Sequence, residues 1–67
     1  MNWQDPDEFV SGEYVVIKAL HEDNTYYMVA VLMDDPEPGR PCKCMSLETN
    51  NEFLVNINSN VWMCELV

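Results

Sequence analysis

The sequence predicts a small, mainly β domain of five short antiparallel strands with a short helix at its N-terminus. Five runs rich in β-branched and aromatic residues are separated by polar or proline-containing segments, which is the pattern of strands and turns. A chain of 67 residues is long enough for one domain, which we assign to residues 1–67. Residues 1–12 are expected to form a short helical segment, and residues 13–67 a β-barrel or sheet.

The helix is predicted in QDPDEFVSG, residues 4–12. Asp5 is a good N-cap, and Pro6 suits the first helical position because its missing N–H has no partner there. Gly12 can take the left-handed conformation that ends a helix. A helix of less than two turns is not stable alone, so Phe9 is expected to pack it on the rest of the domain.

Two apolar runs, EYVVIKAL (residues 13–20) and YYMVAVLM (residues 26–33), are joined by the polar segment HEDNT and predict a β-hairpin. The next segment, DDPEPGRP (residues 34–41), is expected to be a loop because its prolines and glycine cannot belong to a regular ladder. The remaining predicted strands are CKCMSL, EFLVNI and VWMCELV, at residues 42–47, 52–57 and 61–67.

Closure of such a sheet into a barrel would remove most of its exposed strand edges. The order of elements resembles an SH3-like barrel, and more closely its Tudor-type variant. The likeness lies in HEDNTYYMVAVLMDD, with an acidic turn, an aromatic pair and a valine-rich strand, and continues through NEFLVNINSNVWMCEL. It covers residues 13–67 as a pattern of architecture. An OB-like barrel, or an open antiparallel sheet with a helix, stays open as an alternative.

The Tudor-type resemblance also implies a function. Families of this type bind peptides, sometimes methylated ones, through aromatic side chains at one end of the barrel. The aromatic candidates in this sequence are Tyr14, Tyr26, Tyr27 and Trp62. A Tudor-like peptide-binding module is therefore one alternative function, and the competing interpretation is that these aromatic side chains fill the core.

The charge balance is the strongest signal in the composition. Twelve Asp and Glu residues stand against three Lys and Arg, which gives a formal net charge of −9 at pH 7. Direct binding to nucleic acid or to anionic membranes depends on clustered Lys and Arg, so neither is expected. A basic protein surface is the natural complement, although acidity for solubility alone is the competing interpretation. The acidic N-terminus, without a signal-peptide pattern, favours a cytoplasmic protein.

The carboxylates cluster in the predicted helix start, the hairpin turn and the proline loop. Spaced negative charges on a rigid scaffold can imitate DNA phosphates and occupy the basic groove of a nucleic-acid-binding protein. We therefore expect a non-enzymatic acidic interaction module, in concrete terms a small phage or bacterial modulator or inhibitor that docks on a basic host protein. The expected partner-binding residues are Glu22, Asp23, Tyr26, Asp34, Asp35 and Glu37. A merely solvated acidic rim is the competing interpretation.

The cysteines raise the question of a metal site. Cys42 and Cys44 would point to the same face of a strand, and together with Cys64 and His21 they make up the Cys₃His set that suits tetrahedral zinc. A small zinc-binding protein is therefore a further alternative. The spacing lacks the tight turn of structural zinc sites, so we expect small buried hydrophobes, with Lys43 facing solvent between the first two, and no cofactor.

Catalytic residues are not expected in this sequence. A cysteine nucleophile needs a nearby base, and His21 is the only histidine. Paired carboxylates occur only in predicted loops, where the desolvation that tunes an acid is weak. Homodimerisation through an open strand edge remains an alternative for the quaternary state.

Overall fold

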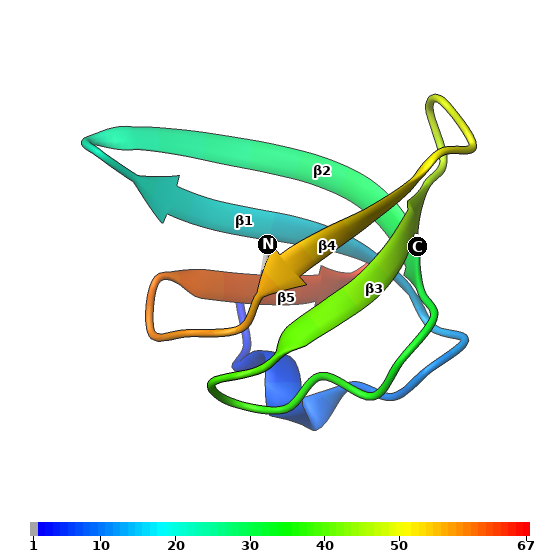
Figure 1. The fold of residues 1–67 in the computed structure, drawn as a ribbon, viewed down its shortest axis with the longest axis horizontal. Coiled ribbons are helices and arrows are strands. Elements are labelled where there is room, and N and C mark those ends of the chain that lie inside the picture. Colours follow the sequence, from blue (N-terminus) through cyan, green and yellow to red (C-terminus); the bar gives the residue numbers. More distant parts are fainter. Residues whose placement is uncertain (1) are drawn as a thin grey trace.

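The computed structural model describes residues 2–67 as one five-stranded antiparallel sheet with a single 3₁₀ turn (Figure 1). The elements in chain order are η1 (Pro6–Glu8), β1 (Tyr14–His21), β2 (Asn24–Leu32), β3 (Pro41–Ser46), β4 (Glu52–Asn56) and β5 (Val61–Glu65). The order across the sheet is β4-β3-β2-β1-β5, so β5 returns to pair with β1. The predicted class, mainly β with five antiparallel strands, is confirmed.

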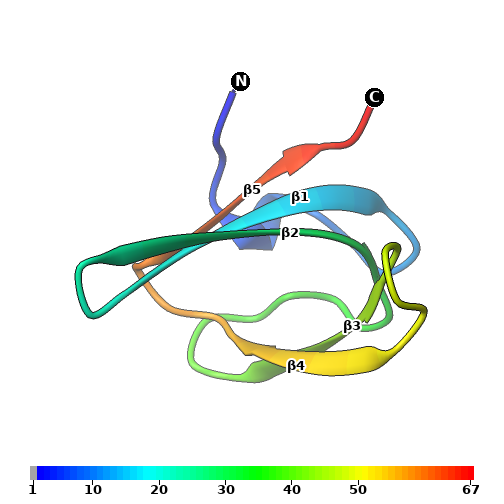
Figure 2. The same cartoon turned by 90° about the horizontal axis from the view of Figure 1, so that it is seen from above.

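The sheet folds over on itself without closing into a barrel. Strands β5, β1 and β2 form one layer, and β3 and β4 lie across from it (Figure 2). Within residues 2–67, no pairing joins β4 to β5. The outer edge of β5 is instead occupied by Gln4, which exchanges two backbone hydrogen bonds with Met63, at 2.8 and 2.9 Å. The expectation of barrel closure is therefore wrong, because the N-terminal segment takes part of the edge that closure would need.

The hairpin turn is tighter than the sequence predicts. The five-residue segment HEDNT was expected to be the turn, but the ladder continues to the pair His21 and Asn24. Only Glu22 and Asp23 lie between the strands, with φ values of 49° and 66°. Two positive φ values belong to turns whose twist matches that of the flanking strands. The extra residues of HEDNT therefore extend the strands.

The N-terminal helix is reduced to one 3₁₀ turn. Pro6 takes the first position as expected, but the Asp5 side chain makes no capping hydrogen bond. Phe9 already has extended backbone angles and is buried in the core, so the chain leaves the helical path there. Gly12 has the positive φ expected of it, 93°, but it does not end the helix, which stops at Glu8.

The core lies between the two layers of the sheet. Alternation along the strands sends one set of side chains inward, as a half-buried sheet requires. The buried cluster consists of Phe9, Val15, Ile17, Ala30, Leu32, Cys42, Cys44, Val55, Ile57, Val61 and Met63. In the part of the chain that the structure describes, no helix has the length and apolar character needed to cross a membrane.

Candidate interaction surfaces

One end of the molecule is strongly acidic. We define the acidic end as the carboxylates of the η1 region and of the proline loop between β2 and β3, with Glu13 between them: Asp5, Asp7, Glu8, Glu13, Asp34, Asp35 and Glu37. Asp5 and Asp7 share a hollow with Pro38 of the proline loop and with the segment after β4. Both segments lie along the bottom of the molecule in Figure 1. The fold thus joins two of the three acidic clusters recognised in the sequence.

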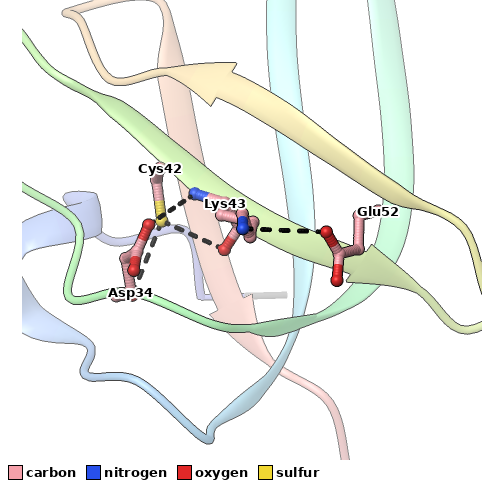
Figure 3. Close-up of polar contacts among 4 residues, drawn as sticks. All are labelled: Asp34, Cys42, Lys43 and Glu52. Atoms are coloured by element: carbon pink, nitrogen blue, oxygen red, sulfur yellow. Dashed lines mark hydrogen bonds and ion pairs between the residues drawn. The ribbon is translucent and has the colours of Figure 1, made fainter.

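Two of the expected contact residues, Asp34 and Asp35, accept hydrogen bonds that stabilise the structure of the acidic end. Asp35 Oδ1 accepts a hydrogen bond of 2.8 Å from the backbone N–H of Ser11, and Asp34 Oδ2 accepts one of 3.1 Å from that of Lys43 (Figure 3). The first bond ties the segment after η1 to the proline loop, and the second ties that loop to β3. Asp34 and Asp35 therefore hold the loop in shape as well as supplying charge.

The other expected contacts lie elsewhere. Glu22 and Asp23 form the hairpin turn at one end of β2, whereas the proline loop leaves the opposite end of this nine-residue strand. At about 3.3 Å per residue, a straight strand of this length would span about 26 Å, and the curvature of β2 brings its ends somewhat closer (Figure 1). Tyr26 is exposed near the hairpin turn. The structure therefore divides the expected contact residues between two distant places.

An aromatic cluster forms on the outer face of the β5-β1-β2 layer. In the ladder, Lys18 of β1 stands between Tyr27 of β2 and Trp62 of β5. The Lys18 Nζ lies 5.3 Å from the ring centroid of Trp62 and 5.3 Å from that of Trp3. The rings of Trp3 and Tyr27 are 6.0 Å apart and tilted by 41°. This aromatic cluster, Trp3, Tyr27 and Trp62, is therefore centred on a cation from the same chain.

The aromatic cluster contains two of the four aromatic candidates from the sequence. Tyr26 points to the opposite face from its neighbour Tyr27, because side chains alternate along a strand. Tyr14 pairs with Val31 at the far end of the hairpin. Trp3 was not among the candidates, since a pattern search cannot show that the N-terminal segment runs back over β5.

All three cations of the chain have acidic or aromatic neighbours. Arg40 lies 3.6 Å from Glu37, and Lys43 lies 3.7 Å from Glu52. Such exposed pairs contribute little to stability. Arg40, which belongs to the proline loop, therefore lies beside a carboxylate of the acidic end.

The thiols of β3 are buried, as the sequence indicates. Cys42 and Cys44 are 2% and 0% exposed, and Lys43 between them reaches solvent. Burial, chiefly, raises the pKa of the Cys44 thiol to about 12, with a smaller contribution from Cys42. Burial also raises the pKa of Cys42, and the nearby carboxylate of Asp34 acts in the same direction. Cys42 Sγ donates to the carbonyl oxygen of Asp34 at 3.5 Å (Figure 3). Both groups are thiols at neutral pH.

The candidate zinc ligands do not gather into one site. Cys42 and Cys44 face the core, His21 is exposed at the end of β1, and Cys64 pairs in register with Val16 on the other face of the sheet. Among residues 2–67, no group of three or more potential ligands is placed to hold a metal ion. The donors of the Cys₃His set thus lie on different faces and ends of the domain.

Comparison of the chain with family models, with curated proteins and with solved structures gave no match.

Proposed function

We propose that this chain is a non-enzymatic protein-interaction module that docks on a basic protein surface through its acidic end. The observation that carries the proposal is the joining of the η1 carboxylates to those of the proline loop in one part of the fold. A large charge of one sign on a small scaffold raises the association rate with an oppositely charged partner.

The geometry also supports the finer form of the proposal, a cytoplasmic modulator that occupies a nucleic-acid-binding groove. Hydrogen bonds that Asp34 and Asp35 accept from backbone N–H groups hold the proline loop in shape, so its charges are presented at little entropic cost. Such a fixed array can compete with phosphates for a basic groove. The concrete proposal is a phage or bacterial protein acting on a host nucleic-acid-binding protein.

The structure indicates which charges should be removed to test this function. Asp7, Glu8 and Glu37 belong to the acidic end, and within residues 2–67 none of their carboxylates accepts a hydrogen bond, although that of Glu37 lies 3.6 Å from Arg40. The acidic-end variant is therefore Asp7→Asn, Glu8→Gln and Glu37→Gln. A matched control, Glu48→Gln, Glu52→Gln and Glu65→Gln, changes the net charge equally at positions outside that end, and Glu52, like Glu37, lies beside a cation.

We expect immobilised wild type and the control variant to retain the same basic protein from a bacterial lysate, and the acidic-end variant to lose it. The retained protein should leave at moderate salt, and a short DNA duplex should displace it, because both compete for the same basic groove. Mass spectrometry of the eluates gives the measurement. Equal retention by both variants would show that general acidity, and not the acidic end, is responsible.

Peptide binding is the second candidate function, and the aromatic cluster favours it. Tyr27 belongs to a cluster of rings and is nevertheless 61% exposed. Exposed aromatic clusters are more typical of recognition surfaces than of cores. Lys18 fills the cation position of the cluster, so a cationic side chain of a peptide would have to displace it.

We expect Tyr27→Ala to abolish any peptide binding while Tyr26→Ala leaves it unchanged, because Tyr27 belongs to the aromatic cluster and Tyr26 lies on the opposite face of the strand. Both are exposed, so both variants should stay folded by circular dichroism. Tryptophan fluorescence titrated with lysine-rich peptides, with and without methylation, is the measurement. Loss of binding in both variants, or in neither, would count against the aromatic cluster as a peptide site.

A further inference from the structure

The outer edge of β4 is an edge of the sheet, because β4 stands last in the strand order. On its inner side, β4 pairs with β3 over five residues. The ladder fixes which backbone groups point inward: Ser46 N–H donates to the carbonyl of residue 51 at 2.9 Å, and the N–H of residue 57 donates to the carbonyl of Arg40 at 3.1 Å. Because this direction alternates along a strand, the odd-numbered residues of β4 bond to β3.

The even-numbered residues of β4 therefore direct their N–H and C=O groups to the free edge. These residues are Glu52, Leu54 and Asn56, and all three are exposed. Native proteins usually protect such an edge with proline, lysine, a bulge or a covering segment. The sequence of β4, EFLVN, contains neither proline nor lysine, whereas Gln4 covers part of the other edge of the sheet, on β5.

We propose that β4 pairs antiparallel with β4 of a second copy of this chain, about a twofold axis at Leu54. In this register Leu54 faces Leu54 of the other copy, and Glu52 faces Asn56. The outward-pointing groups of the three residues then bond in closely spaced pairs, giving about six backbone hydrogen bonds. The result is a continuous sheet through two copies with the same surface on each, as twofold symmetry requires.

The side chains and charges of β4 fit this partner. Leu54 is 66% exposed, and pairing would place the two leucines side by side on one face. Glu52 is the only charged residue of the strand, and it meets an uncharged asparagine from the other copy while its own carboxylate lies 3.7 Å from Lys43. No like charges are opposed in the ladder.

The acidic ends do not oppose this association either. The C-terminal end of β4 leads to Ile57, which lines the same hollow as Asp7 and Pro38. Antiparallel pairing sends the two C-terminal ends of β4 in opposite directions, so the two Ile57 residues would lie about 20 Å apart on opposite sides of the axis. The net charge of −9 per chain still repels over distance, so added salt should strengthen the dimer.

Sedimentation velocity of the full chain over a range of concentrations, in low salt and in about 0.5 M NaCl, tests the proposal. We expect a monomer–dimer equilibrium that moves toward dimer with salt. Leu54→Pro removes the edge N–H but no bond to β3, and should weaken the dimer by about tenfold or more, since two edge bonds are lost per dimer. Leu54→Val, which keeps the N–H and has a similar size, should stay close to wild type.

A cysteine cross-link tests the register and does not depend on whether the Leu54→Pro variant folds. In a closely spaced pair the two Cα atoms are about 5.5 Å apart, which suits a disulfide. Leu54→Cys should therefore form a covalent dimer on mild oxidation far faster than Thr49→Cys, which lies in the turn before β4. A monomeric wild type at every concentration, a dimer that Leu54→Pro leaves intact, or equal cross-linking of the two cysteine variants would overturn the proposal.

Discussion

Replacing Ile17 by alanine is expected to remove a large part of the stability of the domain at 25 °C. Ile17 is fully buried in β1, the strand between β2 and β5, and pairs in register with Met28 and Met63. Removing a buried isoleucine to alanine costs about 2–5 kcal/mol through lost apolar burial and the cavity that remains. A domain of this size has a total stability of about 3–10 kcal/mol. One such substitution therefore removes a large part of it.

Urea unfolding followed by circular dichroism measures this effect. The matched control is Leu20→Ala, on the same strand but 41% exposed, where we expect a change of less than about 1 kcal/mol. A similar midpoint for Ile17→Ala and Leu20→Ala would show that the two-layer core does not hold the fold together.

The second large effect concerns Cys44, which we expect to resist alkylation in the folded state. Burial raises its pKa from 9.0 to about 12, so the thiolate, which is the reactive form, is about a thousandfold rarer than for an unshifted thiol. Iodoacetamide at pH 8 should label Cys44 about a thousandfold more slowly in the native protein than in urea. Mass spectrometry of the peptides resolves Cys44 from the other cysteines.

A Thr49→Cys variant supplies an exposed thiol as an internal standard in the same sample. We expect it to react at the rate of an ordinary exposed cysteine while Cys44 stays unmodified. Labelling of Cys44 at the rate of the standard would contradict its burial in the core.

The same pKa shift has a consequence for stability. Between the unfolded pKa near 9 and the folded pKa of about 12, the folded state keeps a proton that the unfolded state releases. The free energy of unfolding therefore holds its full value below about pH 9 and falls as the pH rises, by up to about 1.4 kcal/mol per pH unit for this group. Between about pH 9 and pH 12, the free energy of unfolding of Cys44→Ala should therefore fall less than that of wild type. Below pH 9 it should be smaller than that of wild type, because a buried side chain has been shortened.

The positions of the strands can be predicted from the local sequence pattern, but whether the sheet closes into a barrel cannot. The five apolar runs, the left-handed Gly12 and the inward pair Cys42 and Cys44 can be recognised because each depends on neighbours within a few positions. Barrel closure depends instead on which segment reaches the edge of β5. Gln4 takes that place through backbone hydrogen bonds, which leave no trace in residue type.

For the candidate surfaces, too, the sequence shows which residues are acidic or aromatic but not which of them the fold brings together. The acidic clusters are visible in the sequence, but their grouping is not, since the hairpin turn at Glu22 and Asp23 and the proline loop lie at opposite ends of β2. Two of the three members of the aromatic cluster can be recognised in the sequence. Tyr27 and Trp62 are strand residues, whereas the contribution of Trp3 follows from the path of the N-terminal segment. The contact role expected of Asp34 and Asp35 stays a prediction beside their observed role as loop acceptors.

The position of β1 between β2 and β5 also sets the order in which the sheet can be assembled. Pairing with β2 needs only a two-residue turn and is fast, as for any hairpin. Pairing with β5 joins Val15 to Glu65 across most of the chain, and such distant contacts form slowly. During synthesis, one side of β1 therefore stays unpaired until β5, Val61–Glu65, has been made. The time that this strand spends incomplete is set by translation, and a chaperone would have that interval in which to bind it.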